Sequence, residues 1–191
     1  MGARTGEEFL RGLRESSREV YIEGELVRDV TTHRAFRNVL DSLAHLYDMQ
    51  HDSEIRDDMT YPSPESGDPV GTPFMQPRTK DDLLKRSRAM SHWARFSHGM
   101  MGRTPDYLSS ALMAFAGAKD YFAATDSRFG DNVERYYREA REQDLCLTHT
   151  LINPQANRSV GPSGQADPFL AARVVKEVDG GIIIRGARML A

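Results

Sequence analysis

Residues 102–107 have the sequence Gly102-Arg103-Thr104-Pro105-Asp106-Tyr107 and lie between two stretches with helical hydrophobic periodicity. Threonine is a good N-cap, and proline fits the first helical position because the N–H there has no intrahelical partner, so this stretch predicts a helix that begins at Pro105. Arg103 then lies just outside the helix, beside unpaired N–H groups and the positive end of the helix dipole. With Tyr107 in the first turn, the arrangement suits an anionic or oxyanion-forming ligand. The simpler alternative is a capped helix with Arg103 and Tyr107 on its surface.

The composition is that of a globular protein. Of the 191 residues, 39% are hydrophobic and 28% are charged, and the net charge is −3, which excludes the basic surface typical of nucleic-acid-binding proteins. No apolar run approaches the roughly 20 residues that span a bilayer, and residues 1–5 lack the apolar core of a secretory signal. We therefore expect neither a nucleic acid nor a membrane as partner. The single cysteine, Cys146, excludes an internal disulfide and fits a cytoplasmic location.

Residues 1–143 are predicted to form a mainly helical N-terminal domain. Four helix starts are expected from capping residues: Thr5 to Glu8, Thr31 or Thr32, Thr79 to Asp82, and Asp131 to Glu134. The third helix should run to about Met100 and the fourth to about Gln143. A small hairpin is expected where apolar pairs flank residues 23–25. Residues 52–78 are polar and rich in Pro, Gly, Ser and Asp, so we expect a long loop that is disordered or simply packed rather than functional, with a short strand pair around 59–61 and 72–75.

A change of periodicity at Asp144 predicts that residues 144–191 begin a β domain. Apolar and polar residues alternate from Leu145 to Ile152, which is the period of a strand, and Asn153-Pro154 ends it with turn chemistry. Residues 179–181 lie between two runs of β-branched residues and predict a hairpin. The chain stops at Ala191 within a strand pattern, so we expect a truncated domain and a sequence that is part of a longer chain.

Few residues outside the 102–107 stretch carry a chemical signal. His149 lies on a predicted strand face with Leu147 and Leu151, where it is either a core histidine or a neutral imidazole at the wall of a cleft. Cys146 falls on the opposite face and is expected to be a small buried residue rather than a nucleophile. No metal site is expected, because the paired histidines are six residues apart, about 240° around a helix, and the known metal motifs are missing. The sequence also lacks a P-loop and a dinucleotide fingerprint.

Five stretches, taken in order, resemble the oxygenase component of 4-hydroxyphenylacetate 3-hydroxylase. They are residues 4–10 (RTGEEFL), 29–33 (DVTTH), 101–107 (MGRTPDY), 149–159 (HTLINPQANRS) and 180–187 (GGIIIRGA). The resemblance covers essentially the whole sequence and less than half of a full family member. It implies an α+β, acyl-CoA-dehydrogenase-like fold with a mainly helical N-terminal domain (1–143), the start of a middle β domain (144–191), and a C-terminal helical bundle that is missing.

The resemblance also implies an activity and its partners. The family is a two-component, FADH2-dependent monooxygenase that uses O2 to hydroxylate a phenol such as 4-hydroxyphenylacetate ortho to its hydroxyl, giving a catechol in aromatic catabolism. A separate NAD(P)H:flavin reductase supplies the reduced FAD. The oxygenase is a cytoplasmic homo-oligomer, a tetramer in the family. We expect the same for the protein that contains this sequence.

Site residues are carried over position by position. Arg103, Tyr107 and His149 match residues that contact the substrate hydroxyl or the reactive oxygen, and they are the expected catalytic residues. The matched substrate-binding positions are Arg103, Thr104, Pro105, Asp106, Tyr107 and His149. The matched FAD-binding positions are His149, Gln155, Ala156, Asn157 and Arg158. On chemical grounds His149 is the base or hydrogen-bond partner of the phenol, and Arg103 stabilises phenolate charge.

Two other interpretations remain open. One is a non-catalytic helical binding fragment, which the reading frame beyond Ala191 would distinguish from an enzyme. The other is an acyl-CoA-type flavin dehydratase or dehydrogenase of the same fold. The sister dehydratases place iron–sulfur cysteines in the helical region, where this sequence has none. Chlorophenol-type relatives lack the tyrosine at position 107, so Tyr107 favours the hydroxyphenylacetate type.

Overall fold

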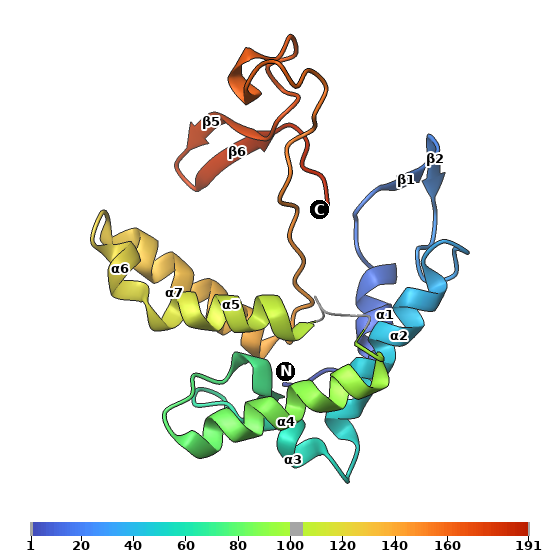
Figure 1. The fold of residues 1–191 in the computed structure, drawn as a ribbon, viewed down its shortest axis with the longest axis vertical. Coiled ribbons are helices and arrows are strands. Elements are labelled where there is room, and N and C mark those ends of the chain that lie inside the picture. The colour runs from blue at the N-terminus through green and yellow to red at the C-terminus, as the bar shows by residue number, and fades with distance from the viewer. Residues whose placement is uncertain (1, 100–104, 191) are drawn as a thin grey trace. The chain divides into compact units, whose positions relative to one another are not determined.

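The computed structural model describes residues 2–99 and 105–190 of the chain. It divides into two compact units, Met1–Leu147 and Thr148–Ala191 (Figure 1). In the first unit the helices are α1 (Gly6–Arg14), α2 (Arg37–Asp48), α3 (Arg56–Met59), α4 (Lys80–Phe96), α5 (Pro105–Gly117), α6 (Lys119–Ala123) and α7 (Ser127–Glu142). Its 3-10 turns are η1 (Met49–His51) and η2 (Thr72–Phe74). Two antiparallel hairpins join β1 (Val20–Ile22) to β2 (Glu25–Val27) and β3 (Thr60–Pro62) to β4 (Pro69–Gly71).

The capping residues set several helix ends as predicted. Thr5 and Thr79 each accept a hydrogen bond from the backbone N–H three residues on, and the acidic residue there bonds back, so both capping boxes are confirmed. The first hairpin is confirmed, with a tighter turn at residues 23–24 than expected. Helix α4 ends at Phe96 rather than near Met100. The reason is that His98 and Gly99 adopt left-handed backbone conformations (φ of 51° and 73°) that a helix cannot continue through.

Two predicted helix starts are wrong. The helix expected from Thr31 or Thr32 begins at Arg37, because the Asp29 carboxylate accepts hydrogen bonds from both the N–H and the hydroxyl of Thr31 and folds the segment into a turn. The helix expected at residues 131–134 begins at Ser127, where Asp126 is the N-cap and accepts from the Arg128 N–H. In both cases an aspartate two residues before the bonded N–H decides the local structure.

Residues 52–78 form part of the core, so the packed alternative expected for this loop is confirmed and the disordered one is wrong. Met59, Val70 and Phe74 are almost fully buried there. The strand pair is present, but residues 60–62 pair with 69–71, and the expected second strand at 72–75 is instead mostly the η2 turn. The Tyr137 hydroxyl of α7 donates to the Phe74 carbonyl at 2.6 Å, which satisfies a buried backbone group in this segment.

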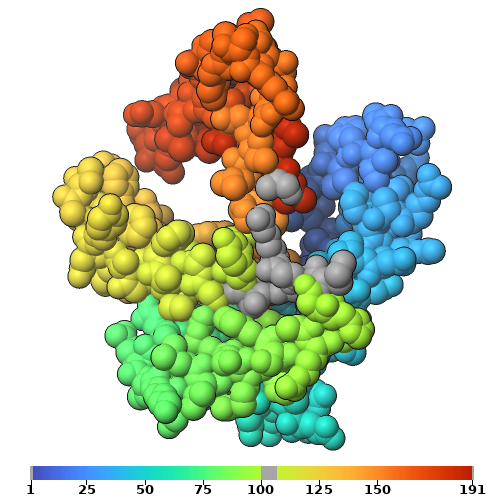
Figure 2. Space-filling model, viewed as in Figure 1, coloured from blue at the N-terminus to red at the C-terminus, as the bar shows by residue number. Residues whose placement is uncertain are grey.

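Three clusters of buried side chains hold the first unit together. They are Phe74, Leu112, Ala116, Tyr137 and Ala140 between η2, α5 and α7; Leu46, Met59, Ala89 and Trp93 between α2, α3 and α4; and Phe9, Ala44 and Tyr47 between α1 and α2. The space-filling view shows the yellow-green α5 segment lying directly on the green segment that contains η2 and α4 (Figure 2). At the crossing of α1 and α2, a side chain on Gly6 would meet the Ala44 carbonyl oxygen at 2.5 Å, so only glycine allows this approach.

The end of α7 is tied to the beginning of the chain by Arg4. Its Nε and Nη2 donate to the Asp144 carbonyl oxygen at 3.0 and 2.5 Å, and the Tyr47 hydroxyl donates to the same oxygen at 3.2 Å. The Asp144 carboxylate is buried and accepts from the Arg4 N–H and from Gln50 Nε2, at 3.0 and 2.7 Å. Leu145 and Leu147 then pack against the core cluster around Phe74.

The second unit is built on one hairpin. β5 (Arg173–Val178) pairs antiparallel with β6 (Gly181–Arg185), as predicted, and η3 covers Pro162–Gly164. The strand predicted over 145–152 is wrong: residues 145–151 have no regular secondary structure, and Ile152 makes a single bridge to Met189. A segment with the right alternation needs a partner strand to become a ladder, and the described residues offer only this bridge. Cys146 is exposed, so its predicted burial is also wrong.

The Asp144 carboxyl predicts an unusual pH dependence of stability. Burial raises its pKa above the usual 3.8, although the hydrogen bonds from Gln50 and Arg4 oppose the shift. Because the carboxyl has a higher pKa in the folded state than in the unfolded state, its protonated form stabilises the fold. This contribution to the free energy of unfolding is lost as the pH rises from about 3.8 through the pKa of the folded state. Asp144→Asn keeps one acceptor for both donors and removes the charge. We expect it to match or exceed the wild type in free energy of unfolding at pH 7, with a flatter pH dependence.

The matched variant Asp144→Ala removes the acceptor as well. It leaves the buried Gln50 amide unpaired and should lose about 1–3 kcal/mol at every pH. Urea unfolding of the three chains between pH 4 and pH 8 checks both expectations. If Asp144→Asn loses as much stability as Asp144→Ala, the charge itself is needed and the argument from burial is wrong.

Candidate functional site

The first turn of α5 carries the described part of the 102–107 stretch. The helix begins at Pro105, as the sequence predicts. Arg103 and Thr104 lie outside the described residues, so the expected cap and the expected cation at the helix end are not placed. Pro105 and Asp106 are the first two residues of the helix, and Tyr107 follows with 50% of its surface exposed. The Tyr107 side chain is therefore half-exposed in the first turn of this helix.

Helix α5 is fixed to the core by contacts with η2, α7 and α4. Leu112 and Ala116 pack against Phe74 of η2 and against α7. Arg86 of α4 adds a polar link, because its Nη2 donates to the Ser110 hydroxyl at 2.8 Å. Arg86 was not predicted from the sequence. One feature of the sequence could have indicated its burial. Arg86 lies three and seven residues before Ala89 and Trp93, on the helix side that is buried.

His149 belongs to the second unit. It is half-buried in the irregular segment after Leu147, whereas Leu151 on the predicted common face is 62% exposed. The predicted apolar strand face around His149 is therefore not formed by the described residues of this unit. Tyr107 and His149 lie in different units, and each is placed only within its own unit.

The residues matched to flavin contacts lie on one loop of the second unit. An open groove of about 440 Å³ is lined by Gln155, Asn157 and Arg158, together with Asn153 and Gln165. All four predicted positions from Gln155 to Arg158 are exposed. The groove therefore offers amide and guanidinium donors on a surface that a large planar or phosphorylated ligand can reach.

The shape of this loop is set by side-chain hydrogen bonds. Gln165 Nε2 donates to the carbonyls of Asn157 and Val160, at 2.8 and 3.3 Å, and Gln165 Oε1 accepts from the Asn157 N–H at 3.2 Å. Asn157 Oδ1 accepts from the N–H and hydroxyl of Ser159. Gln165 was not predicted, because no short-range pattern marks a residue that closes a loop eight positions away.

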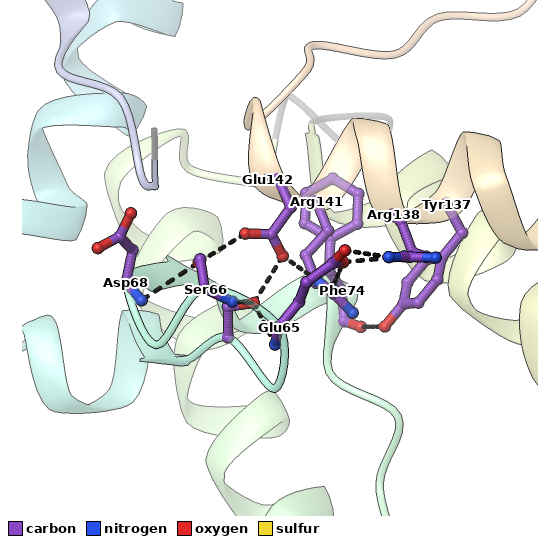
Figure 3. Close-up of polar contacts among 9 residues, drawn as sticks. Glu65, Ser66, Asp68, Phe74, Tyr137, Arg138, Arg141 and Glu142 are labelled. Atoms are coloured by element: carbon purple, nitrogen blue, oxygen red, sulfur yellow. Dashed lines mark hydrogen bonds and ion pairs between the residues drawn. The ribbon is translucent and has the colours of Figure 1, made fainter.

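A second polar cluster fixes the β3–β4 turn on α7 (Figure 3). Glu65 pairs with Arg138 and Arg141, and Glu142 accepts hydrogen bonds from the hydroxyls of Ser63 and Ser66 as well as from Arg141. The hydrogen bond from Arg138 lowers the pKa of Glu65. Burial acts to raise the pKa of Glu142, but these hydrogen bonds outweigh it and lower the value. Both arginines already face carboxylates, so the cluster fits an internal clamp better than an anion site.

Neither a metal-binding cluster nor a membrane-spanning helix occurs in the described ranges. Residues 2–99 and 105–190 contain no group of three or more His, Cys, Asp or Glu side chains that could hold a metal ion. Within the same part of the chain, no helix has both the length and the apolar character that a membrane span requires.

Comparison with known proteins gives consistent matches. Residues 5–191 match the family described as 4-hydroxyphenylacetate 3-hydroxylase N terminal. The 4-hydroxyphenylacetate 3-monooxygenase oxygenase component of Thermus thermophilus is 47% identical over 189 residues, which are 99% of this chain and 38% of that protein. A crystal structure of such an oxygenase component, complexed with FAD and 4-hydroxyphenylacetate, superposes with a TM-score of 0.89 at 46% identity, covering 98% of this chain and 38% of that one.

A more distant similarity concerns the fold alone. An archaeal 4-hydroxybutyryl-CoA dehydratase from N. maritimus is 21% identical with a TM-score of 0.79, over 97% of this chain and 37% of that one. The predicted fold class is confirmed: the chain has the mainly helical N-terminal part of an acyl-CoA-dehydrogenase-like α+β fold. The chain spans about 38% of the length of the Thermus relative. Together with the match over residues 5–191, these similarities show that the chain belongs to the 4-hydroxyphenylacetate 3-hydroxylase family, of which it carries the N-terminal region.

Proposed function

We propose that this chain supplies the N-terminal part of the oxygenase component of a two-component, flavin-dependent monooxygenase. The reaction is the ortho-hydroxylation of a phenol such as 4-hydroxyphenylacetate to a catechol, with O2 and reduced FAD. The observation that carries the proposal is the family match over residues 5–191, a range that includes the 102–107 and 149–159 stretches. The helical domain 1–143 and the beginning of a β domain at 144–191 supply these two stretches.

The proposal includes partners that the protein would need. As in the family, a separate NAD(P)H:flavin reductase would make the reduced FAD. The sequence shows no dinucleotide fingerprint, so we expect that this component does not oxidise NADH by itself. The oxygenase works in the cytoplasm as a homo-oligomer, a tetramer in the family. This inference rests on the family resemblance.

The described residues fit a flavin at the groove of the second unit. Gln155, Asn157 and Arg158 line the 440 Å³ groove with donors suited to phosphate or polar ring atoms, and Ala156 between them is exposed. Bound there, FAD would supply the activated oxygen, and the resemblance assigns His149 as a further flavin contact. The chain's own residues hold and orient it through these side chains.

The phenol chemistry would be divided between the two stretches. A phenol ring is a better nucleophile as phenolate, so a base or strong hydrogen-bond partner at its hydroxyl helps. From the resemblance we assign this role to His149 and a contact with the substrate to Tyr107. Arg103 would stabilise phenolate charge at the positive end of α5, and electrostatic help of this type is often the largest catalytic contribution. Thr104, Pro105 and Asp106 complete the proposed substrate-binding turn.

The first functional test asks which reductant the protein uses. The purified complete chain should hydroxylate a para-substituted phenol only when reduced FAD is supplied, and it should not oxidise NADH alone. Oxygen uptake and catechol formation are measured with NADH, with reduced FAD, and with NADH plus a flavin reductase. Rapid NADH consumption by the oxygenase without a reductase would contradict the proposal. Thioester turnover without O2 consumption would indicate the acyl-CoA alternative.

Arg103→Ala tests the cation at the start of α5. The residue precedes the helix, so we expect melting to change little, hydroxylation to slow by about tenfold or more, and a larger share of the oxidised flavin to end as hydrogen peroxide. Arg95→Ala is the control, because Arg95 is an exposed arginine in the last turn of α4. Unchanged coupling between flavin oxidation and catechol formation in Arg103→Ala would remove Arg103 from the site.

His149→Asn separates a catalytic histidine from a structural one. A general base predicts that single-turnover hydroxylation falls about 10²-fold or more with little change in melting temperature, and that the pH profile loses a limb in the histidine range. A core histidine predicts a loss of about 1–3 kcal/mol with normal chemistry per folded molecule. His98→Asn is the control, since His98 is exposed and its left-handed backbone suits asparagine. A large drop in melting temperature with normal turnover would exclude His149 from catalysis.

A further inference from the structure

Arg86 is a buried cation at the centre of the first unit. Only 8% of its surface is exposed, and its Nη1 donates to the carbonyls of Thr72, Pro73 and Met75 at 3.1, 2.8 and 2.9 Å. A buried guanidinium is tolerated when its donors are satisfied. The three carbonyls belong to η2 and the residue after it, so Arg86 fixes the path of that segment against α4.

A fourth contact of Arg86 reaches a different helix. Its Nη2 donates to the Ser110 hydroxyl of α5 at 2.8 Å. Hydrogen bonds from a charged donor are shorter and stronger than those between neutral groups. The bond therefore holds α5 in a defined position relative to α4 and η2.

Ser110 lies near the start of α5, so its bond to Arg86 acts close to the turn that contains Tyr107. Ser110 lies three residues after Tyr107, which places the two on neighbouring positions of one helix side. The buried apolar contacts of α5 in the core cluster come from Leu112 and Ala116, further along the helix. Ser110 thus anchors α5 closer to the turn that presents Tyr107 than these apolar contacts do.

We propose that Arg86, acting through Ser110, is a positioning residue for the substrate-binding turn at the start of α5. It does not touch the substrate; it fixes where the turn from Pro105 to Tyr107 meets the phenol. This inference rests on the proposed function. A misplaced turn weakens phenol binding and lets activated oxygen decay without reaching the ring. The expected effects are a higher KM for the phenol and poorer coupling of flavin oxidation to catechol formation.

The test removes the acceptor and leaves the arginine in place. Ser110→Ala abolishes the bond to α5 and retains the three carbonyl contacts of Arg86. Ser110→Thr keeps a hydroxyl, and Ser110→Val has nearly the same shape without it. Ser91→Ala is the control, because Ser91 is a helical serine on α4 whose hydroxyl donates to the Ser87 carbonyl within its own helix. All variants are made in the complete chain and assayed with reduced FAD and 4-hydroxyphenylacetate.

The kinetics give the first readout. Ser110→Ala and Ser110→Val should raise KM for the phenol about threefold to tenfold and lower the catechol formed per flavin oxidised, while Ser110→Thr and Ser91→Ala stay near the wild type. Amide hydrogen exchange gives the second readout, and residues 107–112 should exchange faster in Ser110→Ala than in Ser91→Ala. Loss of folded protein alone lowers the amount of active enzyme and changes neither KM nor coupling.

The outcomes separate the two proposals. If the wild type hydroxylates the phenol while Ser110→Ala and Ser110→Val match Ser91→Ala in KM and coupling, the positioning role of Arg86 is overturned and the proposed function stands. If Ser110→Ala does not fold, the Thr and Val pair decides the question, because the two share shape and differ in the hydroxyl. A folded wild type that hydroxylates no phenol with reduced FAD overturns the proposed function itself.

Discussion

The Arg4 side chain joins two parts of the chain that are 140 residues apart, and the first unit is closed by this contact. Its guanidinium and the Tyr47 hydroxyl converge on the carbonyl oxygen of Asp144. Asp144 has a left-handed backbone (φ of 46°), which is uncommon for a residue other than glycine and persists only when its surroundings hold it. The three hydrogen bonds to its carbonyl oxygen stabilise Asp144 in this conformation. The path of the chain from α7 towards Leu147 is thereby set.

Buried polar groups recur throughout this unit and share a design. Arg86, Arg141 and Asp144 are each at most 8% exposed, and each makes several hydrogen bonds to backbone or side-chain groups. Such networks are specific because an unpaired member inside the protein is costly. They fix η2, the β3–β4 turn and the start of the chain, which lie outside the α-helices. The apolar clusters stabilise the unit, and the hydrogen bonds fix the conformation of the segments that connect its helices.

The two candidate contact regions are supported in different ways. The turn at the start of α5 lies at the end of a helix that the core holds on two sides, by Leu112 and Ala116 and by the bond from Arg86 to Ser110. The groove at residues 152–165 lies on a loop whose shape depends on Gln165. Binding groups on short loops and helix ends, carried by a rigid scaffold, are a common arrangement in enzymes.

Sequence alone determined the features that depend on neighbours along the chain. The capping boxes at Thr5 and Thr79, the helix start at Pro105 and the hairpin around residues 179–181 were all predicted, because a cap or a turn is decided within a few residues. The five resembling stretches also indicated the family, which the comparisons show.

Only the tertiary structure decided the rest. Residues 52–78 are polar in composition, yet Met59, Val70 and Phe74 are buried because α4, α5 and α7 cover them, and no local pattern contains that information. The alternation at 145–152 predicted a strand that is not formed, because a strand depends on a partner brought to it from elsewhere in the chain. Arg86 was missed for the same reason: the three carbonyls and the hydroxyl that satisfy it come from segments between 11 and 24 residues away.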